Sequence, residues 1–211
     1  MEITVRIAAR GSHVPSPLTA VDLHYPSDLG ITVSGLGLDT CTEVALAEFG
    51  LQGCPPDSIM GHGSVLAEMA IGAEVLRESV DVAILRAPAQ DGHFAMLFYA
   101  GGGSPISAQI PLSAQLLPAG GAGSIHIHVP LVPTFPEGPN LSVARLQAII
   151  GPRGLTYYER VHGKTVGYRP TGILLPDQCP HGGFPFSASL AFENGTHTTA
   201  RAVVPCRGRA L

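Results

Sequence analysis

The stretch from Asp39 to Gly63, DTCTEVALAEFGLQGCPPDSIMGHG, decides how the chain is expected to fold. Thr40 and Glu43 have the spacing of a capping box, in which each side chain satisfies a backbone donor that a helix start leaves without a partner. Gly50 follows where a residue with left-handed backbone would end the helix. The prolines after Cys54 cannot continue it. The stretch therefore predicts one short helix set among strands.

The four cysteines are spaced as Cys41-x12-Cys54 and Cys179-x26-Cys206. Neither spacing is the close pair that zinc fingers and ribbons use. Four thiols can pair in three ways, and local bridges Cys41–Cys54 and Cys179–Cys206 are the simplest. Each bridge would remove roughly 3 to 4 kcal/mol of freedom from the denatured chain. Because disulfides persist in oxidising compartments, the spacing predicts a secreted or cell-surface protein.

The composition is that of a turn-rich globular protein. Of the 211 residues, 45% are hydrophobic and only 13% are charged, with Gly 26 and Pro 19 spread between the apolar runs. A net charge of -4 without a basic stripe argues against nucleic acid as a partner. No apolar run approaches the length of a membrane-spanning helix. No signal peptide precedes Ile3, so an exported form would have lost a leader.

Apolar residues recur at every second position through most of the chain, which is the pattern of half-buried strands. The alternation is clearest over residues 106–116 and 125–131. Residues 73–80 fit a helix about as well as a strand, and we favour a strand because the period of two continues through Ile84. About a dozen strands with regular turns predict an all-β fold, an antiparallel β-sandwich of immunoglobulin-like or jelly-roll-like type. The one short helix would be joined to it by a disulfide.

The chain is predicted to form a single domain over residues 1–211. Prolines 130, 133, 136 and 139 mark an internal boundary of stiff, extended character. An alternative division places two packed β subdomains at residues 1–132 and 140–211, joined by this proline-rich linker.

Pro111 interrupts the strand predicted at residues 106–116. Proline cannot donate to a sheet ladder, so this strand is expected at a sheet margin or at a bulge. Its outward face is Ser107, Gln109, Ser113 and Gln115, which carries no charge. Natural edges usually carry charges that prevent pairing with another chain. The uncharged face therefore makes self-association, or an extracellular protein partner, a candidate role.

Residues 184–204 predict a hairpin whose register can be argued. One face of its first strand carries Phe184, Phe186, Ala188, Leu190 and Phe192, and the apolar set of its second strand is Ala200, Ala202 and Val204. A two-residue Asn194-Gly195 turn would place Arg201 on the apolar face. A three-residue loop, Glu193 to Gly195 with a left-handed Gly195, instead pairs Phe186 with Ala202. Because a slip of one residue reverses every side chain, the three-residue loop is predicted.

Two longer motifs carry a family resemblance. Cys41 is followed by Cys54-Pro55-Pro56-Asp57-Ser58-Ile59-Met60-Gly61-His62-Gly63, and Cys179-Pro180-His181-Gly182-Gly183-Phe184-Pro185-Phe186 is followed by Cys206. The arrangement resembles an uncharacterised family of secreted bacterial β-rich proteins with the pattern C…CPxxSxxGxG and CPxGGFxF…C. The resemblance implies export and a β fold. That family has no assigned activity, so no functional residue carries over from it.

His126 and His128 are the candidate metal ligands. They stand at i and i+2 of a strand, so both imidazoles project from one face. A metal would need at least one more ligand from a neighbouring strand. The simpler interpretation places both on the solvated side of a strand whose Ile125, Ile127 and Val129 are buried. We favour this interpretation, and no cofactor is predicted.

Other polar residues show no catalytic pattern. His62 and His181 could act as bases but lie beside glycines, as turn residues do. The candidate nucleophiles are Ser58, Ser64 and Ser104, and none lies in a G-x-S-x-G motif. Asn140 and Asn194 begin glycosylation-type triplets, and Asn194 is better explained by its turn.

The predicted function is therefore that of a non-enzymatic secreted or cell-surface structural or binding module, a candidate subunit of an extracellular assembly. The alternative is a metal-dependent binding protein or hydrolase that uses His126 and His128.

Overall fold

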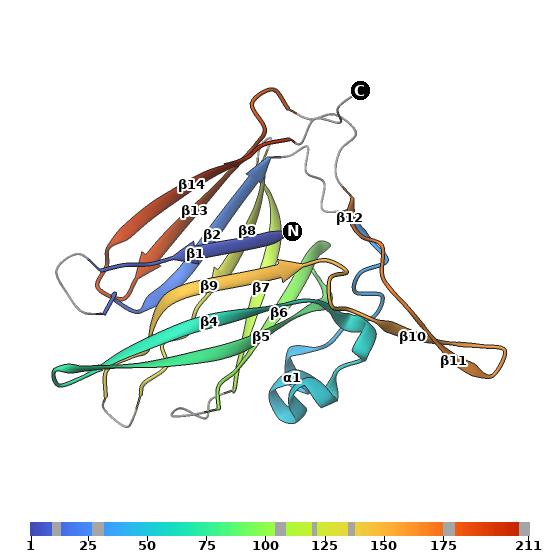
Figure 1. Ribbon diagram of the computed structural model, residues 1–211, viewed down its shortest axis with the longest axis horizontal. Helices are drawn as coiled ribbons and strands as arrows, with labels where there is room; N and C mark the ends of the chain where they lie inside the picture. Colours follow the sequence, from blue (N-terminus) through green and yellow to red (C-terminus); the bar gives the residue numbers. More distant parts are fainter. Residues whose placement is uncertain are drawn as a thin grey trace.

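The computed structural model describes residues 1–9, 14–26, 32–103, 109–119, 122–134, 138–174 and 180–206. Strands dominate this part of the chain, and one α-helix lies among them (Figure 1). In chain order the elements are β1 (Glu2–Arg6), β2 (Leu18–Pro26), β3 (Thr32–Ser34), α1 (Glu43–Phe49), the 3-10 turns Gly50–Gly53 and Pro56–Ser58, β4 (Ile59–Ile71), β5 (Glu74–Gln90), β6 (His93–Gly101), β7 (Gln109–Ala119), β8 (Ala122–His128), β9 (Ser142–Ile150), β10 (Tyr157–Val161), β11 (Lys164–Tyr168), β12 (Gly172–Leu174), β13 (Phe184–Phe192) and β14 (His197–Val204).

Ten of these strands form one sheet in the order β1-β9-β4-β5-β6-β7-β8-β2-β13-β14. Each strand of the sheet runs antiparallel to its neighbours. The sheet curls on itself, so two facing walls enclose a shared interior (Figure 1). The predicted antiparallel all-β class is confirmed, and the facing walls belong to one continuous sheet. The β10–β11 hairpin projects from the body of the molecule.

The curl brings the first strands of the sheet across from its last ones. Val5 of β1 and Val143 of β9 pack with Leu18 and Val21 of β2 and with Leu190 of β13. Burial of these apolar side chains stabilises the curled form, at about 25 cal/mol for each Å² of apolar surface removed from water. The interior is therefore closed by contacts between strands far apart in the sheet order.

Strands from both sides of the proline-rich segment share this sheet. β9 follows that segment in the chain, and it pairs with β1 and with β4. β13 likewise pairs with β2. The two parts of the chain therefore contribute to the same interior.

β6 is buried on both of its faces, as the apolar run from Phe94 to Tyr99 suggests. Met96 and Phe98 face the interior of the curled sheet. Leu97 and Tyr99 point to the other side, where they pack with Leu46 of α1. The helix thus covers the outer face of the sheet at β5 and β6.

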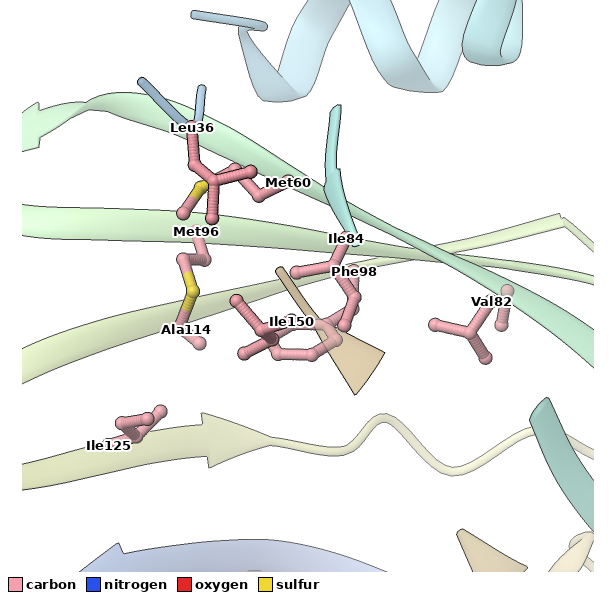
Figure 2. Close-up of a cluster of buried hydrophobic side chains, with 10 residues drawn as sticks. Leu36, Met60, Val82, Ile84, Met96, Phe98, Ala114, Ile125 and Ile150 are labelled. Carbon is pink, nitrogen blue, oxygen red and sulfur yellow. The ribbon is translucent and has the colours of Figure 1, made fainter. Parts of the chain in front are cut away.

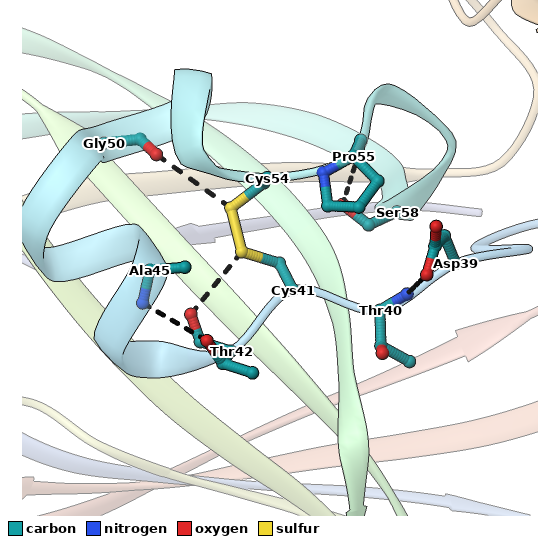
Figure 3. The surroundings of a disulfide bond; sticks show 9 residues. All are labelled: Asp39, Thr40, Cys41, Thr42, Ala45, Gly50, Cys54, Pro55 and Ser58. Atoms are coloured by element: carbon teal, nitrogen blue, oxygen red, sulfur yellow. Dashed lines mark hydrogen bonds between the residues drawn. A yellow bond between two sulfur atoms is a disulfide. The ribbon is translucent and has the colours of Figure 1, made fainter.

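The segment Asp39–Ser58, here called the knuckle, contains α1 and the predicted Cys41–Cys54 disulfide, which is present (Figure 3). The predicted capping box at Thr40 and Glu43 is wrong. The Thr42 side chain caps the helix by accepting a hydrogen bond from the Ala45 amide at 3.2 Å. The helix begins later because the Cys41 amide donates to the Arg86 carbonyl of β5, which ties residue 41 to the sheet.

The end of the helix agrees with the sequence. Gly50 ends α1 with a φ of 61°, a conformation that glycine adopts without strain.

Cys206 is also disulfide-bonded. Its predicted partner, Cys179, lies outside the described residues.

The prediction that the strand over residues 106–116 lies at the edge of a sheet is wrong, because β7 lies between β6 and β8. Residues 104–108 lie outside the described part. Pro111 pairs with Tyr99 of β6, whereas the pairing with β8 covers only the later half of β7, from Ala114. The missing N–H is tolerated because β8 does not extend alongside the first half of β7, where Pro111 lies.

The predicted register of the C-terminal hairpin is confirmed. Phe184 pairs with Val204 and Phe186 with Ala202. Gly195 has a φ of 77° in the three-residue loop, and its amide donates to the Phe192 carbonyl. All eight residues of β14 are exposed, so the apolar set of this strand is not covered.

Within the described residues, no helix has both the length and the apolar character needed to cross a membrane.

Candidate functional site

The interior of the curled sheet contains a cavity of about 180 Å³. Its walls come from every strand of the ten-stranded sheet except β14. They are almost wholly aliphatic and aromatic, because each strand turns alternate side chains inward. Among the residues that line the cavity are Val5, Leu23, Val65, Val82, Phe98, Leu112, Ile125, Leu146 and Ala188.

Among the described residues that line the cavity, two have polar side chains, and both of these already have partners. The Ser142 hydroxyl donates to the Pro15 carbonyl at 2.5 Å. The Gln147 amide donates to Glu2 on the outside of the sheet at 2.8 Å. A ligand in the cavity would therefore meet hydrocarbon on nearly all sides. A polar group placed there would lose its hydration without gaining a partner, which is unfavourable.

The end of the interior nearest the knuckle is filled by side chains. Leu36, Met60 and Met96 cluster beneath α1, together with Ile84 and Ile150 (Figure 2). Met60 and Ile84 are fully buried. Methionine is flexible and fills irregular apolar gaps, so Met60 and Met96 can adapt to the side chains beside them.

Tyr157 fixes this end of the molecule to the start of β4. It is 1% exposed, its hydroxyl donates to the Ile59 carbonyl at 2.6 Å, and it accepts from the Gly37 amide at 2.9 Å. Burial raises the pKa of this phenol above its usual value. The Gly37 carbonyl accepts from Arg86 at 2.7 Å. These bonds hold Leu36 over the interior.

The outer face of the sheet carries the two histidines that the sequence offered as candidate metal ligands. His126 and His128 of β8 are both exposed, as expected from the alternation with Ile125 and Ile127. His126 Nδ1 lies 2.6 Å from Asp22 Oδ1, a carboxylate on the neighbouring strand β2. Both side chains of this pair are about half exposed, at 50% and 44%. Pairs of this kind contribute about 0 to 1 kcal/mol to stability.

The arrangement around His126 does not extend to a metal centre or a triad. Among the residues that the structure describes, no three His, Cys, Asp or Glu side chains are placed to hold a metal ion. Asp22 lies between His126 and Ser189 in the strand register. A serine triad needs the imidazole between the hydroxyl and the carboxylate. Among the described strands, the residues that pair with His126 are thus an acid, Asp22, and an amide, Gln115, and neither is a hydroxyl or thiol nucleophile.

Of the remaining candidate residues that the structure describes, His62 and Ser64 share strand β4 and the others lie on separate elements. Ser58 is fully buried, and its hydroxyl donates to the Pro55 carbonyl at 2.6 Å, which makes it part of the knuckle (Figure 3). His62 is exposed on β4, and His181 is exposed in a turn. Ser64 is half-buried on β4. Ser104 lies outside the described residues.

The two glycosylation-type asparagines differ in their surroundings. Asn140 donates to Glu193 at 2.6 Å, and Ser142 of its triplet is 2% exposed. Asn194 is exposed in the hairpin loop, where its side-chain oxygen accepts from the Thr196 amide at 3.0 Å. The loop explains Asn194, as the sequence suggests.

Two features of the site were not found from the sequence. Asp22 is 104 residues from His126, and only the β2–β8 pairing shows that they meet. Inward-facing apolar residues could be read strand by strand from their alternation. The volume that they leave unfilled depends on how far the sheet curls, which no local pattern records.

No family model, no curated protein and no solved structure matches this chain. The resemblance to secreted bacterial β-rich proteins therefore stays an expectation from the sequence motifs.

Proposed function

We propose that this chain is a non-enzymatic secreted or cell-surface binding module that holds a small apolar molecule inside its curled sheet. The observation that carries the proposal is the interior cavity, whose walls are apolar side chains from every strand of the sheet but β14.

The physical reason is that protein interiors are normally filled to the density of organic crystals. An apolar cavity stays dry, and one of about 150 Å³ in another protein takes up benzene. The cavity of this chain is of similar size, about 180 Å³. It is smaller than the roughly 300 to 1,000 Å³ of pockets for drug-sized ligands. The ligand expected is a single aromatic ring or a short alkyl group.

The knuckle supports the placement of such a module outside the cytoplasm. The Cys41–Cys54 bond joins two buried residues on either side of α1. Disulfides in this structural role persist in oxidising compartments. Both cysteines and Leu46 of α1 pack in the cluster that covers the outer face of β5 and β6.

Benzene is a suitable probe for the proposed site. Titration of the oxidised full-length chain, followed by methyl resonances in ¹H–¹³C NMR spectra, should give saturable shifts at Val82 and Ile125. The change Ala100→Leu adds volume at a cavity wall. It should weaken benzene binding by at least about 10-fold, as small changes of volume in apolar pockets do.

Ala47→Leu is the matched control, because Ala47 is exposed on α1 and does not line the cavity. It should leave benzene binding unchanged. If Ala100→Leu does not fold, Ala148→Leu at another cavity wall replaces it. The absence of saturable binding to the unmodified chain, or equal affinity in a folded filled variant, would overturn the proposal.

A further inference from the structure

Among the described strands, none lies along the outer side of β14. β14 is the last strand of the sheet and pairs with β13. All eight of its residues are exposed, with Val203 at 60% and Val204 at 51%. In the part of the chain that the structure describes, no other strand pairs with it.

The backbone groups that face away from β13 can be identified. The Phe192 amide donates to the Thr196 carbonyl, which makes this a hydrogen-bonded pair. Bonded pairs alternate along an antiparallel ladder, so Thr198, Ala200 and Ala202 also point their backbone groups at β13. His197, Thr199, Arg201 and Val203 therefore point theirs outward. An incoming strand would find a regular row of donors and acceptors there.

Natural edges usually carry charges that discourage such pairing. Between His197 and Val204 the one Lys, Arg, Asp or Glu is Arg201. The side chains are otherwise short, mainly Thr, Ala and Val, which leaves the edge accessible. Its inner-face residues Ala200 and Ala202 continue an apolar row from Ala188 and Phe186 of β13. A partner strand would extend both the ladder and this row.

The sequence of β14 fits a second copy of itself. When two β14 strands run antiparallel about a two-fold axis at Ala200, seven residues pair, from His197 to Val203. Thr199 then stands opposite Arg201 of the second copy, and Ala200 stands opposite Ala200. The two arginines lie diagonally instead of face to face, which avoids the direct like-charge pair that destabilises sheets. The outward-pointing backbone groups meet as hydrogen-bonded pairs in this register.

From this placement we propose that β14 pairs antiparallel with β14 of a second copy of this chain, forming a two-fold dimer. The two-fold contact uses the same strand in both copies, so assembly stops at two chains. The proposal is independent of the interior cavity, because β14 is the strand of the sheet that does not line it.

Charge changes at Thr199 test the register. Thr199→Lys places a lysine opposite Arg201 of the second copy at two symmetric positions, and the dimer should dissociate about 10-fold more readily. Thr199→Glu places a carboxylate there and should tighten the dimer by about as much. The pair Thr199→Lys with Arg201→Glu should restore dimerisation. Sedimentation equilibrium of the oxidised full-length chain over a range of concentrations measures each constant.

The two Thr199 variants distinguish the proposed dimer from other states of the chain. Thr199 is exposed on an edge strand, so neither substitution should affect folding, and thermal unfolding checks this. A dimer whose constant moves in opposite directions for the two variants supports the proposed register. A chain that is monomeric at all concentrations, that forms open-ended polymers, or that responds equally to both charges would overturn it. A monomer that captures a different chain at this edge would also overturn the pairing with a second copy.

Discussion

The two edges of the sheet, β1 and β14, differ in burial although each has one neighbour among the described strands. β1 alternates exposed and half-buried residues, because Ile3 and Val5 face the interior. β14 is exposed at every position. The cause is the curl, which places β1 across from β2 and β13 and leaves β14 outside that contact.

The edges also differ in charge. Glu2 and Arg6 lie on the outward face of β1, at its two ends, where charged residues discourage pairing with other chains. On β14, Arg201 is the one Lys, Arg, Asp or Glu that could have the same role. An edge that is buried on one face and charged on the other is protected. The self-association that we propose therefore uses β14 and not residues 106–116, whose described part lies inside the sheet.

The largest difference in stability loss is expected between substitutions on β13 and substitutions on its neighbour β14. Leu190 of β13 is 4% exposed and packs against Val21 of β2. Leu190→Ala should lower the free energy of unfolding by about 2 to 5 kcal/mol, through lost burial and the cavity that remains. Val203→Ala, on the exposed strand, should change it by less than about 0.5 kcal/mol. Urea unfolding measures both, and similar losses would show that β14 is packed after all.

Proline substitutions distinguish the backbone amides of β14 that face β13 from those that face outward. Ala200 directs its amide at β13, so Ala200→Pro should leave a carbonyl of β13 without its donor and cost about 1 to 3 kcal/mol. Thr199 directs its amide outward, and Thr199→Pro should cost much less. Urea unfolding at concentrations where the chain is monomeric makes the comparison. Equal losses would contradict the assigned direction of the backbone groups.

The loop that sets the register of β14 should respond to a smaller change. Gly195 has a φ of 77° and open space where a Cβ would lie. Gly195→Ala should therefore destabilise the chain through backbone strain alone, by about 1 to 2 kcal/mol. Gly103 also has open space but no left-handed backbone, so Gly103→Ala is the matched control and should be close to neutral. Thermal unfolding of the two variants tests this difference.

The features that the sequence predicts correctly are local ones. The register of the β13–β14 hairpin depends on its three-residue loop and on the alternation of apolar side chains in two strands that are consecutive in the sequence. The Cys41–Cys54 bond spans 13 residues and encloses one helix. In both cases the residues that decide the structure are close together in the sequence.

The features that it misses depend on long-range pairing. Pro111 correctly marks a stretch that has one neighbour, yet the strand as a whole lies inside the sheet because β8 and β6 flank it. The helix start moves from Thr40 to Thr42 because a carbonyl of β5 holds Cys41. The partner of His126 and the interior cavity likewise exist only once distant strands meet.

The smallest effect is expected at the outer face of β1. Glu2 accepts from Gln147 at 2.8 Å, and Arg153 lies 4.0 Å from its other oxygen, with the arginine 80% exposed. Solvent and salt screen such contacts, so Glu2→Gln should cost less than about 0.5 kcal/mol. Val5→Ala on the same strand removes half-buried carbon from the interior and should cost about 1 kcal/mol. Urea unfolding in low and high salt compares the two variants. If Glu2→Gln proved the costlier change, β1 would be held by charges on its outer face, and the curl of the sheet would not explain why the two edges differ.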